Sequence, residues 1–154
     1  MPEHRDYRTP HGVLHYDPII CRDDYPNIVV YDQGGGHTVL WLQRCAMKAF
    51  WAAEIRLAKR LGWSDKRIKD NGGHGRAIRV LPGTNRTCAR QAQLYRLDPH
   101  RYASPNTTAH TRAFALDVDQ AQPNLPIIRA ALLAEGWKQV RADEPWHYSY
   151  FIAV

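Results

Sequence analysis

Four residues in the second half of the chain have the types and the spacing of a hydrolytic site built on one metal ion. His110 is followed by Asp117, and Glu144 and His147 form a Glu-x-x-His pair further along. Catalytic zinc usually takes three nitrogen or oxygen ligands from the protein and keeps a fourth position for water. We therefore expect His110, Asp117 and His147 to hold one Zn²⁺ per chain, which leaves Glu144 as a base.

The chemistry expected of such a site is hydrolysis. Zinc lowers the pKa of a bound water from about 15.7 towards about 7. A carboxylate within hydrogen-bond reach can then take the proton of that water as it attacks a carbonyl carbon. Glu144 is the candidate for this role, because the three predicted ligands leave its carboxylate uncommitted.

Alternation along residues 113–119 predicts a strand that presents Asp117 to the site. Successive residues of a strand point to opposite faces. The larger apolar members of the run share one face: Phe114, Leu116 and Val118. The small and acidic members share the other: Ala113, Ala115, Asp117 and Asp119. Two readings of Asp119 stay open, namely a residue that orients a histidine ligand and a solvated acid at the strand end.

The second part of the site is expected to combine a loop with a strand. On an ideal strand Glu144 and His147 would point to opposite faces. Pro145 cannot donate to a sheet ladder and tends to stand at the start of a strand. We therefore expect Glu144 in the incoming loop and His147 on the strand that follows, with Trp146 and Tyr148 in the core.

These residues resemble the signature of a known family. Thr-x-His-x-x-Ala-x-Ala-x-Asp from Thr108 to Asp117, followed by Glu-Pro-Trp-His, is similar to Ser-x-His-x-x-Gly-x-Ala-x-Asp with Glu-x-x-His. That signature belongs to peptidase family M15, which contains D-alanyl-D-alanine carboxypeptidases, VanY-like enzymes and the L-alanyl-D-glutamate endopeptidases that bacteriophages use as endolysins. The resemblance implies zinc bound at His110, Asp117 and His147, and catalysis by Glu144.

The resemblance also implies a fold and a further catalytic residue. The fold is the α+β Hedgehog/DD-peptidase fold, in which helices flank a small antiparallel sheet with a zinc site. The family element Gly-Tyr-Arg-Ser/Thr-x-x-x-Gln is matched loosely by residues 83–91, with one residue more before the arginine. Arg86 would then assist at the substrate carbonyl. Ala113 replaces the glycine of the signature, and because alanine disfavours positive φ, we expect extended backbone there.

The activity implied is that of a zinc metallopeptidase that cuts the peptidoglycan stem peptide, as a phage endolysin of the L-Ala–D-Glu type. A D,D-carboxypeptidase or D,D-dipeptidase on the same scaffold is an alternative. A catalytically silent, wall-binding zinc module is another, although a structural site has no need of the base that Glu144 would supply. A basic nucleic-acid binder is the third, and it would show a steep dependence on salt.

Length and composition are those of one folded globular domain. The chain has 154 residues, 44% of them hydrophobic and 23% charged, which is a typical balance for such a domain. We treat residues 1–154 as one domain, with residues 1–40 as an N-terminal extension of uncertain role. The net charge of +6 favours polyanions such as anionic wall polymers. Basic residues are scattered and form no recognisable nucleic-acid module, so we expect no nucleic-acid partner.

Cysteines and apolar runs bear on the cellular location. Cys21, Cys45 and Cys88 include no Cys-x-x-Cys, which predicts neither a disulfide framework nor a thiolate zinc site. No apolar run is long enough to cross a membrane, and the N-terminus lacks the apolar segment of a signal peptide. We therefore expect a monomer made in the cytoplasm without a signal peptide, which reaches the cell wall after a holin opens the membrane.

Hydrophobic periodicity and turn residues predict a mixture of strands and helices without a βαβ repeat, which favours an α+β fold. The expected strands span 28–31, 38–42 and 77–81, and the expected helices span 44–61, 87–97 and 125–135. Gly62 and Gly136 would end two of these helices, and Thr87 would cap the third. His37 and His74 stand in glycine-rich loops, where we expect them to be exposed.

Overall fold

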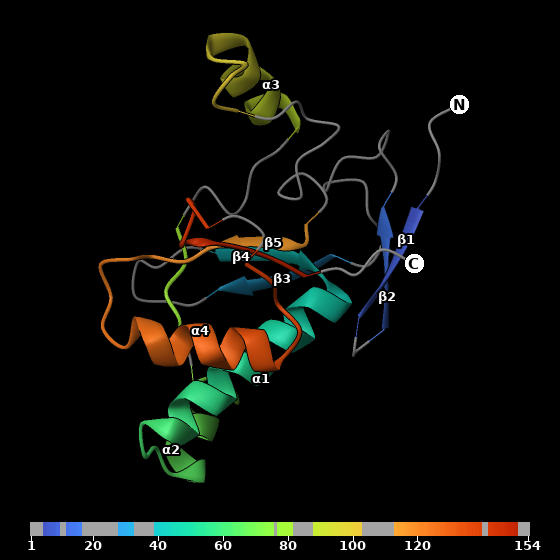
Figure 1. Ribbon diagram of the computed structural model, residues 1–154. Helices are drawn as coiled ribbons and strands as arrows, with labels where there is room; N and C mark the ends of the chain where they lie inside the picture. The colour runs from blue at the N-terminus through green and yellow to red at the C-terminus, as the bar shows by residue number, and fades with distance from the viewer. Residues whose placement is uncertain are drawn as a thin grey trace.

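The computed structural model of the chain describes residues 5–9, 12–16, 28–32, 39–75, 77–81, 88–102, 113–139 and 142–150. Within these ranges the fold is α+β, as the sequence predicts (Figure 1). The strands are β1 (Arg5–Thr9), β2 (Gly12–Tyr16), β3 (Ile28–Asp32), β4 (Val39–Gln43), β5 (Ala115–Asp117) and β6 (His147–Ser149). The helices are α1 (Arg44–Arg60), α2 (Asp65–Asp70), α3 (Cys88–Leu97) and α4 (Leu125–Ala134).

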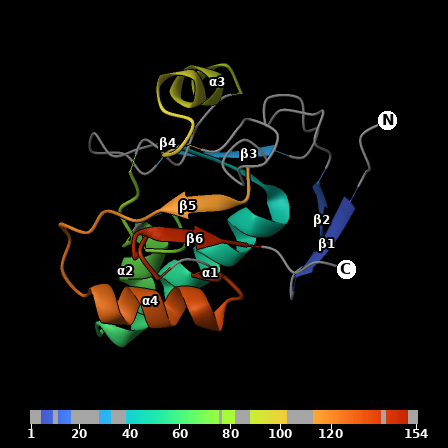
Figure 2. The same cartoon turned by 45° about the horizontal axis from the view of Figure 1, so that its top comes forward.

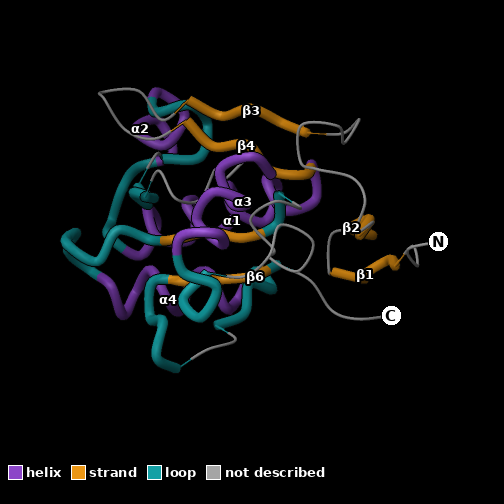
Figure 3. Tube along the Cα trace, turned by 90° about the horizontal axis from the view of Figure 1, so that it is seen from above, coloured by secondary structure: helices purple, strands orange, loops and turns teal. Residues whose placement is uncertain are grey.

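The described strands form three antiparallel pairs: β1 with β2, β3 with β4, and β5 with β6. The pair β5–β6 is widened on both sides by single-residue bridges. Val80 pairs with Val118 on the side of β5, and Lys138 pairs with Ser149 on the side of β6. The N–H of Gln43, at the end of β4, donates to the carbonyl of Ala113 at 2.9 Å. This bond ties the β3–β4 pair to the start of β5, so the two pairs lie side by side (Figure 3).

Helices cover the strands from two sides. In two views, α1, α2 and α4 lie on one side of β3–β6 and α3 lies on the other (Figures 1 and 2). Along α1 the buried residues recur at three- and four-residue steps: Ala46, Ala49, Phe50, Ala53 and Leu57. This spacing puts them on one helical stripe. The helix ends before Gly62, whose φ of +82° suits glycine far better than other residues.

The core fills the space between the strands and the helices α1 and α4. It receives Leu40 and Leu42 from β4 and Leu116 from β5, all with no exposed surface. Ile128 and Leu132 enter it from α4, which packs against α1. An apolar layer therefore packs against one face of the strand pair β5–β6. Burial of each such side chain stabilises the fold by about 1.5–3 kcal/mol.

Several local expectations are corrected. The helix α2 was not expected; Ser64 caps it by accepting a hydrogen bond from the N–H of Arg67 at 3.1 Å. The hairpin β1–β2 lies at the start of the N-terminal extension, where no strand was expected. The strand expected over 77–81 is reduced to the bridge at Val80, although main-chain bonds still join Leu81 to Asp117, at the end of β5, and Arg79 to Asp119, after it.

The prediction of an exposed His74 is wrong. His74 is 8% exposed, and its Nδ1 lies 3.0 Å from Oε1 of Glu54, a fully buried residue in the middle of α1. The ring of Trp51 stacks on the imidazole at 5.4 Å between centroids, and the hydroxyl of Tyr31 lies 3.3 Å from Nδ1. A buried carboxylate needs hydrogen-bond partners, and His74 supplies one of them despite its glycine-rich surroundings.

Among the described residues, no helix has the length and apolar character that crossing a membrane requires.

Candidate metal centre

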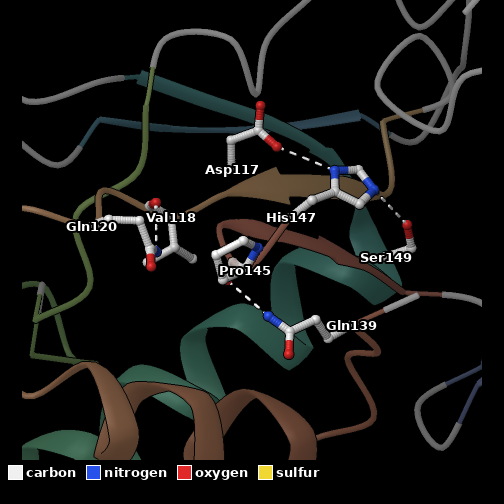
Figure 4. A network of polar contacts seen from close by, with 7 residues as sticks. All are labelled: Asp117, Val118, Gln120, Gln139, Pro145, His147 and Ser149. Atoms are coloured by element: carbon white, nitrogen blue, oxygen red, sulfur yellow. Dashed lines mark hydrogen bonds and ion pairs between the residues drawn. The ribbon is translucent and has the colours of Figure 1, made fainter. Parts of the chain in front are cut away.

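Asp117 and His147, two of the predicted ligands, face each other across the β5–β6 pair (Figure 4). They are register partners, so their side chains leave the sheet on the same face. Nδ1 of His147 lies 3.1 Å from Oδ1 of Asp117. Both side chains are largely buried: that of His147 is 13% exposed and that of Asp117 is 7% exposed. Of the alternation predicted for residues 113–119, the apolar side is confirmed, because Phe114, Leu116 and Val118 enter the core.

The separation of these two donor atoms fits a shared metal ion. Two ligands that each lie about 2.0–2.1 Å from a tetrahedral zinc are about 3.3 Å apart. The observed 3.1 Å is close to this value. The donor types also fit, because zinc accepts imidazole nitrogen and carboxylate oxygen. Without a metal ion, the same geometry lets the imidazole N–H donate to the carboxylate.

Ser149 contacts the other ring nitrogen of His147. Its hydroxyl oxygen lies 3.1 Å from Nε2, and it stands two residues further along β6 on the same face. Histidines that bind metals almost always engage the second ring nitrogen in a hydrogen bond, which fixes the tautomer and the orientation of the ring. A hydroxyl can both donate and accept, so Ser149 can serve either tautomer. Ser149 is not among the residues predicted from the sequence, although the period of two along β6 could have indicated it.

Glu144 lies in a tight turn directly before β6, so the expected loop position is confirmed. The N–H of His147 donates to the carbonyl of Glu144 at 3.0 Å, which closes the turn over residues 144–147. Pro145 is the second residue of this turn, where its fixed φ is favoured. The turn places the main chain of Glu144 beside one end of the Asp117–His147 pair.

All three carbonyls that lead from the loop into β6 are hydrogen-bonded. The carbonyl of Glu144 accepts from the N–H of His147, and that of Trp146 accepts from the N–H of Val118 at 2.7 Å. The carbonyl of Pro145 accepts from Nε2 of Gln139 at 2.8 Å (Figure 4). The backbone of the turn is therefore fixed relative to the end of β5, through Val118, and relative to Gln139, which precedes the turn in the chain.

The expectation of extended backbone at Ala113 is wrong. Ala113 has a φ of +59°, in the left-handed region, and it is 2% exposed. The chain turns there into β5, and the carbonyl of Ala113 accepts from Gln43, which helps to hold this conformation. Glycine adopts positive φ at little cost. The chain therefore has, at the position where the resembled signature has glycine, a backbone conformation that favours glycine.

The structure also bears on the expectations for Asp119, Tyr148 and Trp146. Oδ1 of Asp119 accepts from the N–H of Ala121 at 2.9 Å, so this carboxylate stabilises the turn that follows β5. The structure favours the strand-end reading of Asp119.

Tyr148 is buried at 3% exposure, as expected, whereas Trp146 is 36% exposed and was wrongly assigned to the core. The turn over 144–147 directs Trp146 outward because its backbone is not yet part of the strand.

The other two predicted site residues, His110 and Arg86, lie outside the described residues. Within the described ranges, no group of three His, Cys, Asp or Glu residues is arranged to hold a metal ion. The structure therefore brings Asp117 and His147 together and places Glu144 at the adjoining turn. A third ligand and the role of Arg86 remain predictions from the sequence.

The chain matches none of the known protein-family models, and a search of curated proteins gives no match to it either.

Proposed function

We propose that this chain is a zinc peptidase that hydrolyses a peptide bond in the stem peptide of bacterial peptidoglycan, on a Hedgehog/DD-peptidase fold. The observation that carries the proposal is the 3.1 Å approach of Asp117 and His147 across β5–β6, with Glu144 at the turn that enters β6. The left-handed Ala113, at the glycine position of the resembled signature, supports it further.

In the proposed mechanism, Asp117 and His147 would hold zinc together with His110, and Ser149 would keep the imidazole of His147 in place. Bound zinc would acidify a water molecule and polarise the scissile carbonyl. Glu144 would take a proton from the attacking water and later give it to the leaving amine. Arg86 would stabilise the negative charge that develops on the carbonyl oxygen. A well-placed donor contributes roughly 3 kcal/mol to such stabilisation.

The substrate class rests on the resemblance and on charge. The signature is that of enzymes that act on the peptidoglycan stem, and the net charge of +6 suits an anionic wall. Within this class we propose an endolysin-type endopeptidase that cuts between L-Ala and D-Glu. A D,D-carboxypeptidase or D,D-dipeptidase would use the same zinc, base and arginine, and differs in the bond that it cuts.

Digestion of purified peptidoglycan by the zinc-loaded protein tests the proposal, with mass spectrometry of the released fragments. New amino termini on D-Glu are the expected product, whereas free D-Ala would identify a carboxypeptidase. Glu144→Ala is the matched control and should release neither. If wild type and Glu144→Ala release the same fragments, or if neither releases any from several wall types, the proposed function is wrong.

A further inference from the structure

We propose that Gln139 is a positioning residue for Glu144 and that Arg129, on α4, orients Gln139. The inference rests on the proposed function, in which Glu144 is the base. Gln139 lies between α4 and β6 and joins the side chain of Arg129 to the main chain of the turn that carries Glu144.

Two hydrogen bonds fix the side-chain amide of Gln139 at both ends. Nε of Arg129 donates to Oε1 of Gln139 at 3.1 Å. Nε2 of Gln139 donates to the carbonyl of Pro145 at 2.8 Å. A guanidinium has donors and no acceptor, so Arg129 selects the oxygen end of the amide. The NH₂ end is thereby left facing Pro145, the residue directly after Glu144.

This contact completes the anchoring of the turn. The carbonyls of Glu144 and Trp146 are held by main-chain N–H groups of His147 and Val118. The carbonyl between them, that of Pro145, receives the side chain of Gln139. Of these three carbonyls, that of Pro145 is held by a side chain, and Gln139 supplies the donor.

The place of Gln139 in the sheet strengthens the inference. Lys138, its neighbour, exchanges two main-chain hydrogen bonds of 2.8 Å with Ser149, the residue that contacts Nε2 of His147. One short segment, Lys138 and Gln139, therefore supports both the strand that carries the predicted ligand His147 and the turn that carries the predicted base. Figure 4 shows the bond from Gln139 to Pro145 and the contact between Ser149 and His147.

The surroundings of Gln139 make it suitable for substitution. Gln139, Arg129, Pro145 and Tyr148 line a pocket of about 360 Å³ that is partly open to solvent. A changed side chain at position 139 therefore meets solvent on one side and leaves no sealed cavity in the core. Misplacement of a catalytic group by about 1 Å can cost roughly a hundredfold in rate, so even a small shift of the turn should be visible in turnover.

Gln139→Glu is the decisive variant, because it keeps the size of the side chain and the acceptor for Arg129 but removes the donor to Pro145. We expect the kcat for wall hydrolysis to fall about ten- to hundredfold, with KM and zinc content unchanged. Gln93→Glu is the charge-matched control, because Gln93 also accepts from an arginine, Arg90 Nη1, at 3.2 Å, on the exposed face of α3. It should keep near wild-type kcat.

The role of Arg129 is tested separately. In a Gln139→Leu background, Arg129→Met should cost no further kcat, because Arg129 is expected to act through the amide that has been removed. Additive losses in the double variant would show that Arg129 acts on its own, and the orienting role would then be wrong.

A readout that does not need activity separates this inference from the proposed function. The N–H groups of His147 and Val118 donate into the turn, so Gln139→Glu should speed their hydrogen exchange about five- to tenfold, as expected for the loss of one hydrogen bond. Unchanged exchange, or unchanged kcat, would overturn the positioning role. A wild-type protein without Glu144-dependent hydrolysis would overturn the proposed function instead, whatever the exchange rates show.

Discussion

The imidazole of His147 and the carboxylate of Asp117 meet at 3.1 Å across two short antiparallel strands, although 30 residues of chain separate them. The pairing is a consequence of register: Asp117 stands directly opposite His147, Ala115 opposite Ser149, and Leu116 opposite Tyr148. A shift by one residue would turn His147 towards the core. The buried pair Leu116 and Tyr148 fixes the register, because the opposite alternation would place their side chains on the polar face.

Asp117→Asn should weaken zinc binding by more than about a hundredfold, because the amide keeps the size of the side chain but removes its negative charge. Chelator competition followed by metal analysis measures the affinity. Asp119→Asn is the matched control, since Asp119 stabilises the turn after β5. An equal loss of affinity in both variants would contradict the assignment of Asp117 as a ligand.

Ser149→Ala should lower zinc affinity about ten- to a hundredfold, the usual effect of removing a group that orients a ligand histidine. Ser149→Thr keeps the hydroxyl at a strand position, where a β-branched side chain is favoured, and should retain more affinity than Ser149→Ala. Calorimetric titration with zinc compares the two. If both variants bind like wild type, Ser149 has no role in holding His147.

Ala113→Gly should change the free energy of unfolding by less than about 1 kcal/mol, because relief of the left-handed backbone offsets the lost methyl group and the greater freedom of the unfolded chain. Ala115 is equally buried and lies on the strand β5. Ala115→Gly has no such relief and should destabilise by about 1–2 kcal/mol. Urea unfolding measures both. Equal costs would show that the conformation of Ala113 carries no strain.

Glu54→Gln should gain stability relative to wild type as the pH rises from about 4.5 towards neutrality. Burial raises the pKa of the Glu54 carboxyl above its ordinary value, and the hydrogen bonds from His74 and from the N–H of Ile78 offset this in part. The folded state therefore keeps a proton that the unfolded state releases. The stability that Glu54 contributes is complete below the unfolded pKa and is lost as the pH passes the raised folded pKa.

Urea unfolding of wild type and Glu54→Gln at several pH values between 4.5 and 7.5 measures this difference. Glu135→Gln, which removes the carboxyl that pairs with the exposed side chain of Arg56, is the matched control. A constant difference between Glu54→Gln and wild type across this range would show that Glu54 has the same affinity for protons in both states.

The sequence was sufficient where a local pattern decides the structure. The alternation around Asp117 predicted β5 and its two faces, and the helical spacing with a following glycine predicted α1 and α4. Pro145 predicted that Glu144 would stand in the loop before β6. In each case the information lies within a few residues, and tertiary packing agrees with it.

The sequence was insufficient where residues far apart in the chain determine the local structure. His74 is buried because Glu54, twenty residues earlier, needs a partner inside the core. Ala113 adopts a left-handed backbone because the chain must turn into β5 and bond to Gln43. Gln139 could not be linked to the turn from the sequence, because a glutamine outside any motif carries no signal of its partner. Residue type alone does not determine these positions.

The most direct test of the central claim is one preparation of Glu144→Ala, analysed for zinc content and for hydrolysis of peptidoglycan beside wild type. We expect about one zinc ion per chain in both proteins, since three ligands suffice for such a site, and loss of turnover in the variant, since the base is gone. Zinc lost together with Glu144 would make this residue a ligand. Retained turnover in the variant would contradict the role of Glu144 as the base.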